Sequence, residues 1–160
     1  MRDLRLRLSQ IVVDEGFNAR KNYAPLHRKA DVEVGVADEA HPETIEALAA
    51  DIRRRDLVTP LTVILLPPPD LRYFLAAGFR RYQALRLNGG DPEVPCRLLG
   101  GGMREAKVVN LVENLRRSNL RAWEVADRCA ELHVDGMLVA EIAVEIGRSE
   151  AYVQRQVKFV

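Results

Sequence analysis

The segment ENLRR, at residues 113–117, places a carboxylate, a carboxamide and two guanidinium groups within five positions. Glu113 and Asn114 offer oxygen ligands of the kind that Mg2+ prefers. Glu113 could also position or activate a water molecule for hydrolysis. A polar helix end in contact with solvent is the simpler explanation of these residues. A metal and phosphate site becomes the better explanation only if phosphate-binding groups occur elsewhere in the chain.

Such groups occur in the segment AAGFRRYQAL, at residues 76–85. A predicted strand ends at Gly78, and a predicted helix follows with Arg80 and Arg81 in its first turn. Backbone N–H groups and the helix dipole favour an anion there, and guanidinium groups match phosphate oxygens. Gly78 would let the backbone approach a ligand closely, although a turn glycine before two surface arginines explains the segment as well. Together the two segments predict the phosphate end and the metal end of one nucleotide site.

The composition limits the kinds of protein that the chain can be. Its 160 residues are 48% hydrophobic, so a core can form in one compact domain or in a domain with a small appendage. The net charge is +1, so any contact with nucleic acid must come from local clusters of charge. The sequence contains no apolar run long enough to cross a membrane, and its N-terminus lacks the apolar region of a secretory signal.

The cysteines and histidines carry no metal or disulfide motif. Cys96 and Cys129 belong to no CxxC motif, which predicts reduced thiols in the cytoplasm. The three histidines show no spacing that indicates zinc. Cys129 is expected to be a core thiol, because the inner face of a predicted helix contains Ala122, Ala126, Cys129 and Ala130.

The hydrophobic pattern predicts a mixture of strands and helices. Strands are expected at residues 4–13, 61–66, 71–77 and 94–99. Helices are expected to begin at Pro42, after Gly78 and at Met103. Residues 31–41 are expected to form an irregular insertion or a short strand with a turn.

The last part of the chain, residues 138–160, predicts two short helices around a turn at Gly147, as in a helix-turn-helix. Ala143, Val153 and Val157 supply apolar positions that such a pair needs, although a generic helical hairpin would look similar. Because the chain stops at Val160 within an apolar, helix-like pattern, we expect a fragment of a longer protein.

Four segments resemble, in the correct order, the sequence boxes of ParB-type partition proteins. AAGFRRYQAL resembles the GERRxRA box, and ENLRRSNL resembles the ENLQREDL box. FNARKNY resembles the NPRK box near the N-terminus, and DLVTPLTVI resembles the GLxxPLxV box. The predicted helix-turn-helix follows at the right distance, so the resemblance covers nearly the whole chain.

The resemblance implies an α+β fold. A ParB/sulfiredoxin-like mixed-sheet domain would occupy residues 1–117, and an all-α helix-turn-helix region would occupy residues 118–160. The implied activity is binding of CTP with Mg2+ and hydrolysis of CTP, in a homodimer that closes as a clamp on DNA at the nucleoid. The implied partners are DNA with a parS-like site, a second copy of the chain and a ParA-type ATPase, without a membrane. The family's C-terminal dimerisation domain is expected to lie outside this chain.

The resemblance also assigns roles to individual residues. Glu113 would be the catalytic group and, with Asn114, a ligand of the metal. The nucleotide would be bound by Asn18, Arg20, Leu57, Val58, Thr59, Pro60, Gly78, Phe79, Arg80, Arg81, Asn114 and Arg116. Of these, residues 57–60 would line the base pocket largely through backbone groups. DNA would be contacted by Arg148, Ser149, Tyr152, Gln154 and Arg155.

Three substitutions distinguish the chain from the usual boxes. Phe79 replaces the glutamate of the GERR box, and Arg116 replaces the glutamine of ENLQR. Glu150 stands where the family usually has a basic residue that contacts DNA; it can accept from cytosine N4 but costs affinity near phosphates. These changes favour a plasmid, phage or divergent ParB-like protein with its own DNA site.

Three other functions are alternatives to that of a ParB-type partition protein. Sulfiredoxin shares the fold, but Phe79 occupies its cysteine position, which excludes thiol chemistry there. A kinase or nuclease on the same fold is an alternative. So is an adaptor that binds nucleotide but neither hydrolyses it nor contacts DNA. The adaptor is favoured by the near-neutral charge of residues 137–160, with three acidic and three basic residues.

Overall fold

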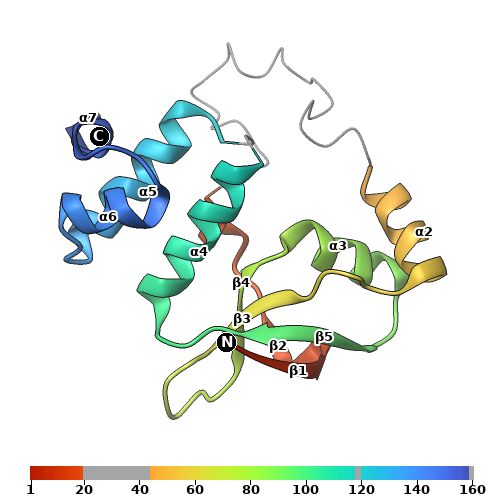
Figure 1. Cartoon of the computed structure of the whole chain (residues 1–160). Helices are drawn as coiled ribbons and strands as arrows, with labels where there is room; N and C mark the ends of the chain where they lie inside the picture. The colour runs from red at the N-terminus through yellow and green to blue at the C-terminus, as the bar shows by residue number, and fades with distance from the viewer. Residues whose placement is uncertain (20–43, 118–119, 159–160) are drawn as a thin grey trace.

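A mixed β-sheet with its helices lies beside a group of C-terminal helices in the computed structural model (Figure 1). The structure describes residues 1–19, 44–117 and 120–158. The strands are β1 (Arg2–Arg7), β2 (Ile11–Val12), β3 (Leu61–Leu65), β4 (Tyr73–Ala77) and β5 (Glu93–Leu98). The helices are α2 (Ile45–Arg55), α3 (Phe79–Asn88), α4 (Met103–Arg116), α5 (Ala122–Val134), α6 (Val139–Ile146) and α7 (Glu150–Lys158), with short 3-10 helices at Leu8–Gln10 and Glu15–Phe17.

The five-stranded sheet has the order β1-β5-β3-β4-β2 and contains both parallel and antiparallel pairs. β1 runs antiparallel to β5, with Leu4 opposite Cys96, and β5 runs parallel to β3. β3 and β4 form an antiparallel pair, and β2 adds to β4 in parallel. The predicted α+β fold with a mixed sheet is therefore confirmed.

The single strand predicted at residues 4–13 is wrong, because the chain turns at Leu8–Gln10 and sends β1 and β2 to opposite edges of the sheet. Distant residues hold this turn. Leu8 N donates to Pro92 O at 3.2 Å, and Ser9 N and Oγ donate to the Asp91 carboxylate at 2.8 and 2.7 Å. A local alternation of apolar residues contains no information about such contacts.

Helix α2 begins at Ile45, and the prediction of a start at Pro42 is therefore wrong. Thr44 caps it, since its Oγ1 accepts from Ala47 N at 3.1 Å. Pro42 and the predicted insertion at residues 31–41 lie outside the described residues. Strands β3, β4 and β5 lie where the pattern predicted them, with ends shifted by one or two residues.

Two buried apolar cores occur in the described residues, and α4 contributes to both. The first contains the inner face of the sheet with α2 and α3, and it includes Ala106 of α4. The second joins Leu111 of α4 to α5, α6 and α7. The domain boundary predicted at residue 117 stays a prediction.

The C-terminal helices partly match the expected packing. Ala126 and Cys129 on α5 are buried, as predicted, but Ala122 is exposed, and Val125 and Leu132 complete the buried face. α6 and α7 flank a turn at Gly147, which has a φ of 67°. Ile142, Ala143 and Val153 are buried between them. None of the helices in the described segments is long and apolar enough to span a membrane.

Candidate functional site

Gly78 joins β4 to α3 in a conformation that a side chain would not tolerate. Its φ is 99°, and an added Cβ would lie 2.9 Å from Leu61 Cδ2. Helix α3 then presents its N-terminal turn, whose first N–H groups have no acceptor within the helix. The strand, glycine and helix predicted for the phosphate end of the site are therefore present.

Arg81 is not a surface arginine, since its side chain is only 13% exposed. The alternative explanation, a turn glycine followed by two surface arginines, therefore does not hold for Arg81. Its Nη1 donates to Thr59 O at 2.7 Å and to Pro60 O at 2.5 Å. Its Nη2 lies 3.3 Å from Glu113 Oε1. Burial lowers the pKa of the Arg81 guanidinium, and the Glu113 carboxylate opposes this shift. Arg81 thus ties the segment at residues 57–60 to α3 and α4.

Glu113 neutralises two guanidinium groups through one oxygen. Its Oε1 lies 3.3 Å from Arg81 Nη2 and 2.7 Å from Arg117 Nη2. Arg117 did not belong to the predicted site, although its spacing of four residues from Glu113 on a helix could have identified it. Arg116 instead lines a groove with Gly147 and Arg148, between α4 and the turn before α7.

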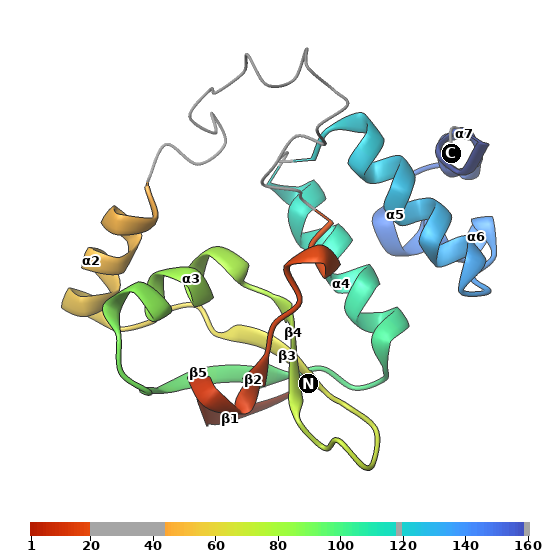
Figure 2. The same ribbon diagram turned by 180° about the vertical axis from the view of Figure 1, so that it is seen from behind.

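Three asparagine side chains form a network beside this ion pair. Asn110, which is 1% exposed, donates from Nδ2 to Asn18 Oδ1 at 3.2 Å and to Ala76 O at 2.9 Å. Its Oδ1 accepts from Ala19 N at 2.7 Å. Asn114 Nδ2 lies 3.4 Å from Asn18 Oδ1 and 2.7 Å from Asn110 O. Figure 2 shows how the segment that ends at Ala19 runs beside α4.

The sequence did not single out Asn110, which the structure shows to connect two predicted site residues. It lies four positions before Asn114, within the otherwise apolar run VVNLV. A lone amide on the apolar side of a helix, one turn from a predicted ligand, was the available signal.

The remaining predicted nucleotide-binding residues have mixed positions. Leu57 is half-buried against the first core, whereas Val58 and Thr59 are exposed. Phe79 is buried in that core, so only its backbone can face a ligand. Arg80 is half-buried in the first turn of α3, and Arg20 lies outside the described residues.

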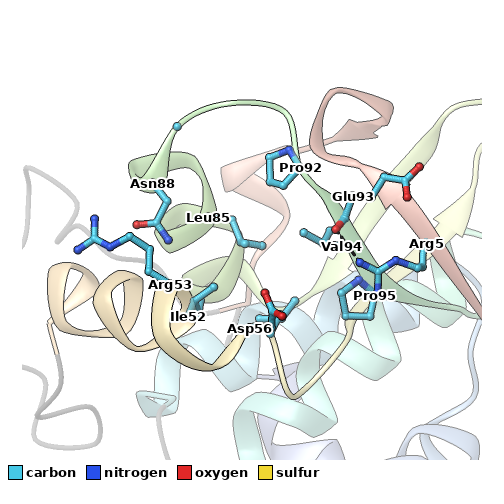
Figure 3. Close-up of a pocket in the computed structure, with 12 residues that line it drawn as sticks. Arg5, Ile52, Arg53, Asp56, Leu85, Asn88, Pro92, Glu93, Val94 and Pro95 are labelled. Atoms are coloured by element: carbon cyan, nitrogen blue, oxygen red, sulfur yellow. Dashed lines mark hydrogen bonds between the residues drawn. The ribbon is translucent and has the colours of Figure 1, made fainter.

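A separate hollow of about 280 Å3 lies at the other end of α3 (Figure 3). It is lined by Asn88 of α3, by Ile52 and Arg53 of α2, and by Arg5 of β1, whose Nη2 donates to Glu93 O at 3.0 Å. A helix of ten residues is about 15 Å long, so this hollow is well separated from Gly78. Only Leu57 belongs both to its lining and to the predicted site.

The oxygen groups at the site suit a cation that arrives with phosphate. In the part of the chain that the structure describes, no cluster of three or more His, Cys, Asp or Glu side chains could hold a metal alone. Mg2+ typically keeps several waters and binds through one or two protein oxygens together with substrate phosphates. Glu113 and Asn114 therefore fit a metal that is shared with a nucleotide.

The predicted DNA-binding residues lie on the turn before α7 and on α7 itself. Ser149 Oγ accepts from Tyr152 N at 3.1 Å, and the Arg148 guanidinium lies 5.8 Å from the Tyr152 ring centroid. Arg148, Gln154 and Arg155 are exposed, as is Glu150. Their contact with DNA stays a prediction.

A family model confirms the resemblance. The model of the ParB N-terminal domain matches residues 33–115, which is more than half of the chain. The chain belongs to the ParB N-terminal domain family.

Relatives with known names agree with this membership. The chain is 34% identical over 113 residues to a probable chromosome-partitioning protein ParB of Vibrio cholerae, covering 70% of this chain and 38% of the relative. It is 33% identical over 116 residues to the transcriptional repressor protein KorB of Escherichia coli, covering 72% of this chain and 32% of the relative. It is 35% identical over 118 residues to the chromosome-partitioning protein Spo0J of Thermus thermophilus, covering 74% and 42%. The chain thus spans about a third to two fifths of these relatives.

Solved structures agree with the fold. A C-terminally truncated ParB from Caulobacter crescentus, complexed with CTP-gamma-S, matches 99% of this chain and 78% of its own, with a TM-score of 0.53 and 18% identity. The same kind of truncated ParB, complexed to the centromeric parS site, matches 99% of this chain and 71% of its own, with a TM-score of 0.57 and 18% identity.

Proposed function

We propose that this chain binds CTP with Mg2+, hydrolyses it, and acts as the nucleotide-dependent switch of a ParB-type DNA partition protein. One observation carries the proposal. Gly78 and Arg81, Glu113 and Asn114, and Asn18 come from three distant segments and meet at one place. Each of these segments contains one of the ParB-like boxes. The CTP-gamma-S complex of the related Caulobacter crescentus structure supports the choice of nucleotide.

The site residues would bind different parts of the nucleotide and its metal. The first turn of α3 and Arg80 would bind phosphate, and Asn18 would donate to it. Asn114 would present its oxygen to Mg2+, which would neutralise charge on the phosphates. The backbone groups of residues 57–60 would face the base. Because Thr59 O and Pro60 O already accept from Arg81, that guanidinium would hold the base pocket in shape and lie at the edge of the phosphate site.

Glu113 would position the attacking water and take its proton, with Arg81 and Arg117 holding the carboxylate in place. Glu113→Gln should leave CTP binding largely intact and remove most hydrolysis, because an amide keeps the shape but cannot act as a base. Phosphate release by the purified variant measures this. Unchanged turnover would remove Glu113 from the chemistry.

The C-terminal helices would supply DNA contacts through Arg148, Ser149, Tyr152, Gln154 and Arg155. The further parts of the proposal are a parS-like DNA site, a CTP-dependent homodimer, a ParA-type ATPase partner and a place at the nucleoid. The parS complex of the related structure supports the DNA site, and the names of the partition relatives support a role in partition.

Calorimetric titration with CTP, ATP, GTP and UTP, each with and without Mg2+, tests the proposal. CTP should bind at least ten times more tightly than the others, which corresponds to about 1.4 kcal/mol. Equal affinity for ATP would contradict the choice of CTP.

A nucleotide-binding adaptor without DNA contact is the second candidate. It is favoured by the exposed Glu150 in the first turn of α7. A DNA-shift assay at two salt concentrations separates the candidates, because phosphate contacts weaken steeply as salt rises. No shift at low salt would favour the adaptor.

A further inference from the structure

We infer that Asn110 is a positioning residue that sets the hydrogen-bonding direction of two other amides, Asn18 and Asn114. As a result, one amide faces an anion and the other faces a cation. The inference rests on the proposed function, since it concerns how that site distinguishes phosphate from metal.

Two backbone groups decide which way the Asn110 amide lies. Its Oδ1 accepts from Ala19 N at 2.7 Å, and its Nδ2 donates to Ala76 O at 2.9 Å. A backbone N–H can only donate and a carbonyl can only accept, so only one orientation of the amide satisfies both. Asn110 is 1% exposed, and the reversed orientation would leave buried polar groups unsatisfied, which is costly.

The orientation of the Asn110 amide fixes that of the Asn18 amide. The second N–H of Asn110 Nδ2 points to Asn18 Oδ1, at 3.2 Å. Asn114 Nδ2 lies on the same oxygen at 3.4 Å. The Asn18 oxygen is therefore held toward α4 by two donors. Its NH2 group lies on the opposite edge of the amide, where it can donate to a phosphate oxygen.

The amide of Asn114 is held in the opposite orientation, with its nitrogen toward the other two asparagines. Its Nδ2 is held by Asn110 O at 2.7 Å and by the Asn18 oxygen. Its own Oδ1 is consequently the edge that remains for a ligand, and an amide oxygen suits Mg2+. The side chain of Asn110 thus orients Asn18, and its backbone carbonyl and side chain together with Asn18 orient Asn114, which leaves a donor for phosphate and an acceptor for metal on two identical side chains.

The position of Asn110 is a poor choice for packing alone. It lies on α4 between Ala106 of the first core and Leu111 of the second, where an apolar side chain would cost less to bury. Its side chain forms hydrogen bonds with groups at the site, namely Asn18, Ala19, Ala76 and Asn114.

Asn110→Leu tests the inference, because it keeps the branched shape of the side chain and removes every hydrogen bond of its amide. We expect CTP affinity in Mg2+ to fall at least tenfold. We also expect the ratio of affinities with and without Mg2+ to fall, because Asn114 loses its contacts with Asn110 Oδ1 and with a fixed Asn18 oxygen and keeps only its bond to the backbone carbonyl of residue 110. Leu132→Ala, in the distant second core, is the matched control: it destabilises the protein but should leave this ratio unchanged.

A double-mutant cycle with Asn114→Ala makes the test specific. If Asn110 acts through Asn114, the double variant should lose no more Mg2+ dependence than Asn114→Ala alone. Additive losses, or an unchanged ratio in Asn110→Leu, would overturn the inference. Failure of the wild-type chain to bind any nucleotide would instead contradict the proposed function.

If Asn110→Leu does not fold, the wild-type chain still decides the question by NMR of its side-chain amides. Titration with CTP in EDTA should shift the NH2 signals of Asn18, because they donate to phosphate. Addition of Mg2+ should then perturb Asn114. Unchanged Asn18 signals in the presence of bound CTP would overturn the inference.

Discussion

The sheet region and the helical region are each held by an apolar core that includes a residue of α4, whereas the N-terminal segment is joined to α4 and α5 by buried polar side chains. Arg128 of α5, which is 2% exposed, donates to Phe17 O and lies 4.9 Å from the centroid of the Phe17 ring. A second connection of this segment is Asn110 of α4 with Asn18 and Ala19. Polar contacts depend on direction and can be exchanged for contacts with water, so the boundary between the regions can change at lower cost than either core.

Arg128 shows what such a boundary costs. Burial lowers the pKa of its guanidinium, and Glu131 and Asp135 oppose the shift. Its Nη1 lies 3.4 Å from Glu131 Oε2, but its Nε has no hydrogen-bond partner among the described residues. A buried charge that is only partly satisfied stabilises the contact weakly. It is therefore suited to a contact that opens and closes.

The largest expected effect comes from opening the second core. Leu132→Ala removes a fully buried side chain and should cost about 2–5 kcal/mol of unfolding free energy, measured by chemical denaturation. Val144→Ala on α6, at a site that is 81% exposed, is the control and should change stability by less than about 0.5 kcal/mol.

Thiol labelling shows which region this substitution opens. Cys96 belongs to the first core and Cys129 to the second. With Cys96→Ala and Cys129→Ala variants, Leu132→Ala should accelerate labelling of Cys129 far more than labelling of Cys96. Equal acceleration would show that the two regions open together.

The next effect concerns the site itself. Arg81→Ala should abolish CTP binding and also cost about 1–3 kcal/mol of stability, because Thr59 O, Pro60 O and Glu113 lose their partner. Calorimetry and thermal denaturation measure the two losses. Arg86→Ala, an exposed position on the same helix, should change neither. Retained binding in folded Arg81→Ala would show that this arginine has only a structural role.

A smaller effect is expected at the boundary. Arg128→Met keeps the length of the side chain but removes the donor to Phe17 O. We expect a change in stability of about 1 kcal/mol, with faster hydrogen exchange at residues 14–19 and in α5 and little change within the sheet. Asp127→Ala, which is exposed on the same helix, is the control. Faster exchange throughout the sheet would contradict a separable boundary.

The last effect is absent near neutral pH and appears only as a loss of stability at alkaline pH. Burial raises the pKa of Cys96 and of Cys129 from 9.0 to about 11. The unfolded chain therefore releases these protons first, and the contribution to stability is complete below pH 9.0 and lost as the pH rises toward 11. The unfolding free energy, measured by chemical denaturation at several pH values in this range, should depend less on pH in the double variant Cys96→Ala, Cys129→Ala. The same pH dependence in that variant would assign the loss to other groups.

The sequence predicted those features that depend on local pattern. Helix α4 begins at Met103 as predicted, and the turn before α3 lies at Gly78 as predicted. The membership in the ParB N-terminal domain family and the mixed sheet were also predicted correctly, because the boxes are local segments.

The features that sequence reasoning missed depend on contacts between distant residues. The break at Leu8–Gln10 is made by Asp91 and Pro92. The burial of Arg81 depends on carbonyls more than twenty positions earlier, and the role of Asn110 depends on Ala19. Pattern analysis of a single helix treats Asn110 as one polar exception, and only the fold shows that it joins three segments.

The order of the strands affects how the chain can assemble as it leaves the ribosome. β1 pairs with β5 in a register that places Arg2 opposite Leu98, whereas β3 and β4 are neighbours in the chain. The residues of β1 must therefore wait until almost a hundred later residues have emerged before their edge of the sheet can form. The β3–β4 hairpin can form early, and the N-terminal strand joins last, so translation order and folding order run in opposite directions at this edge.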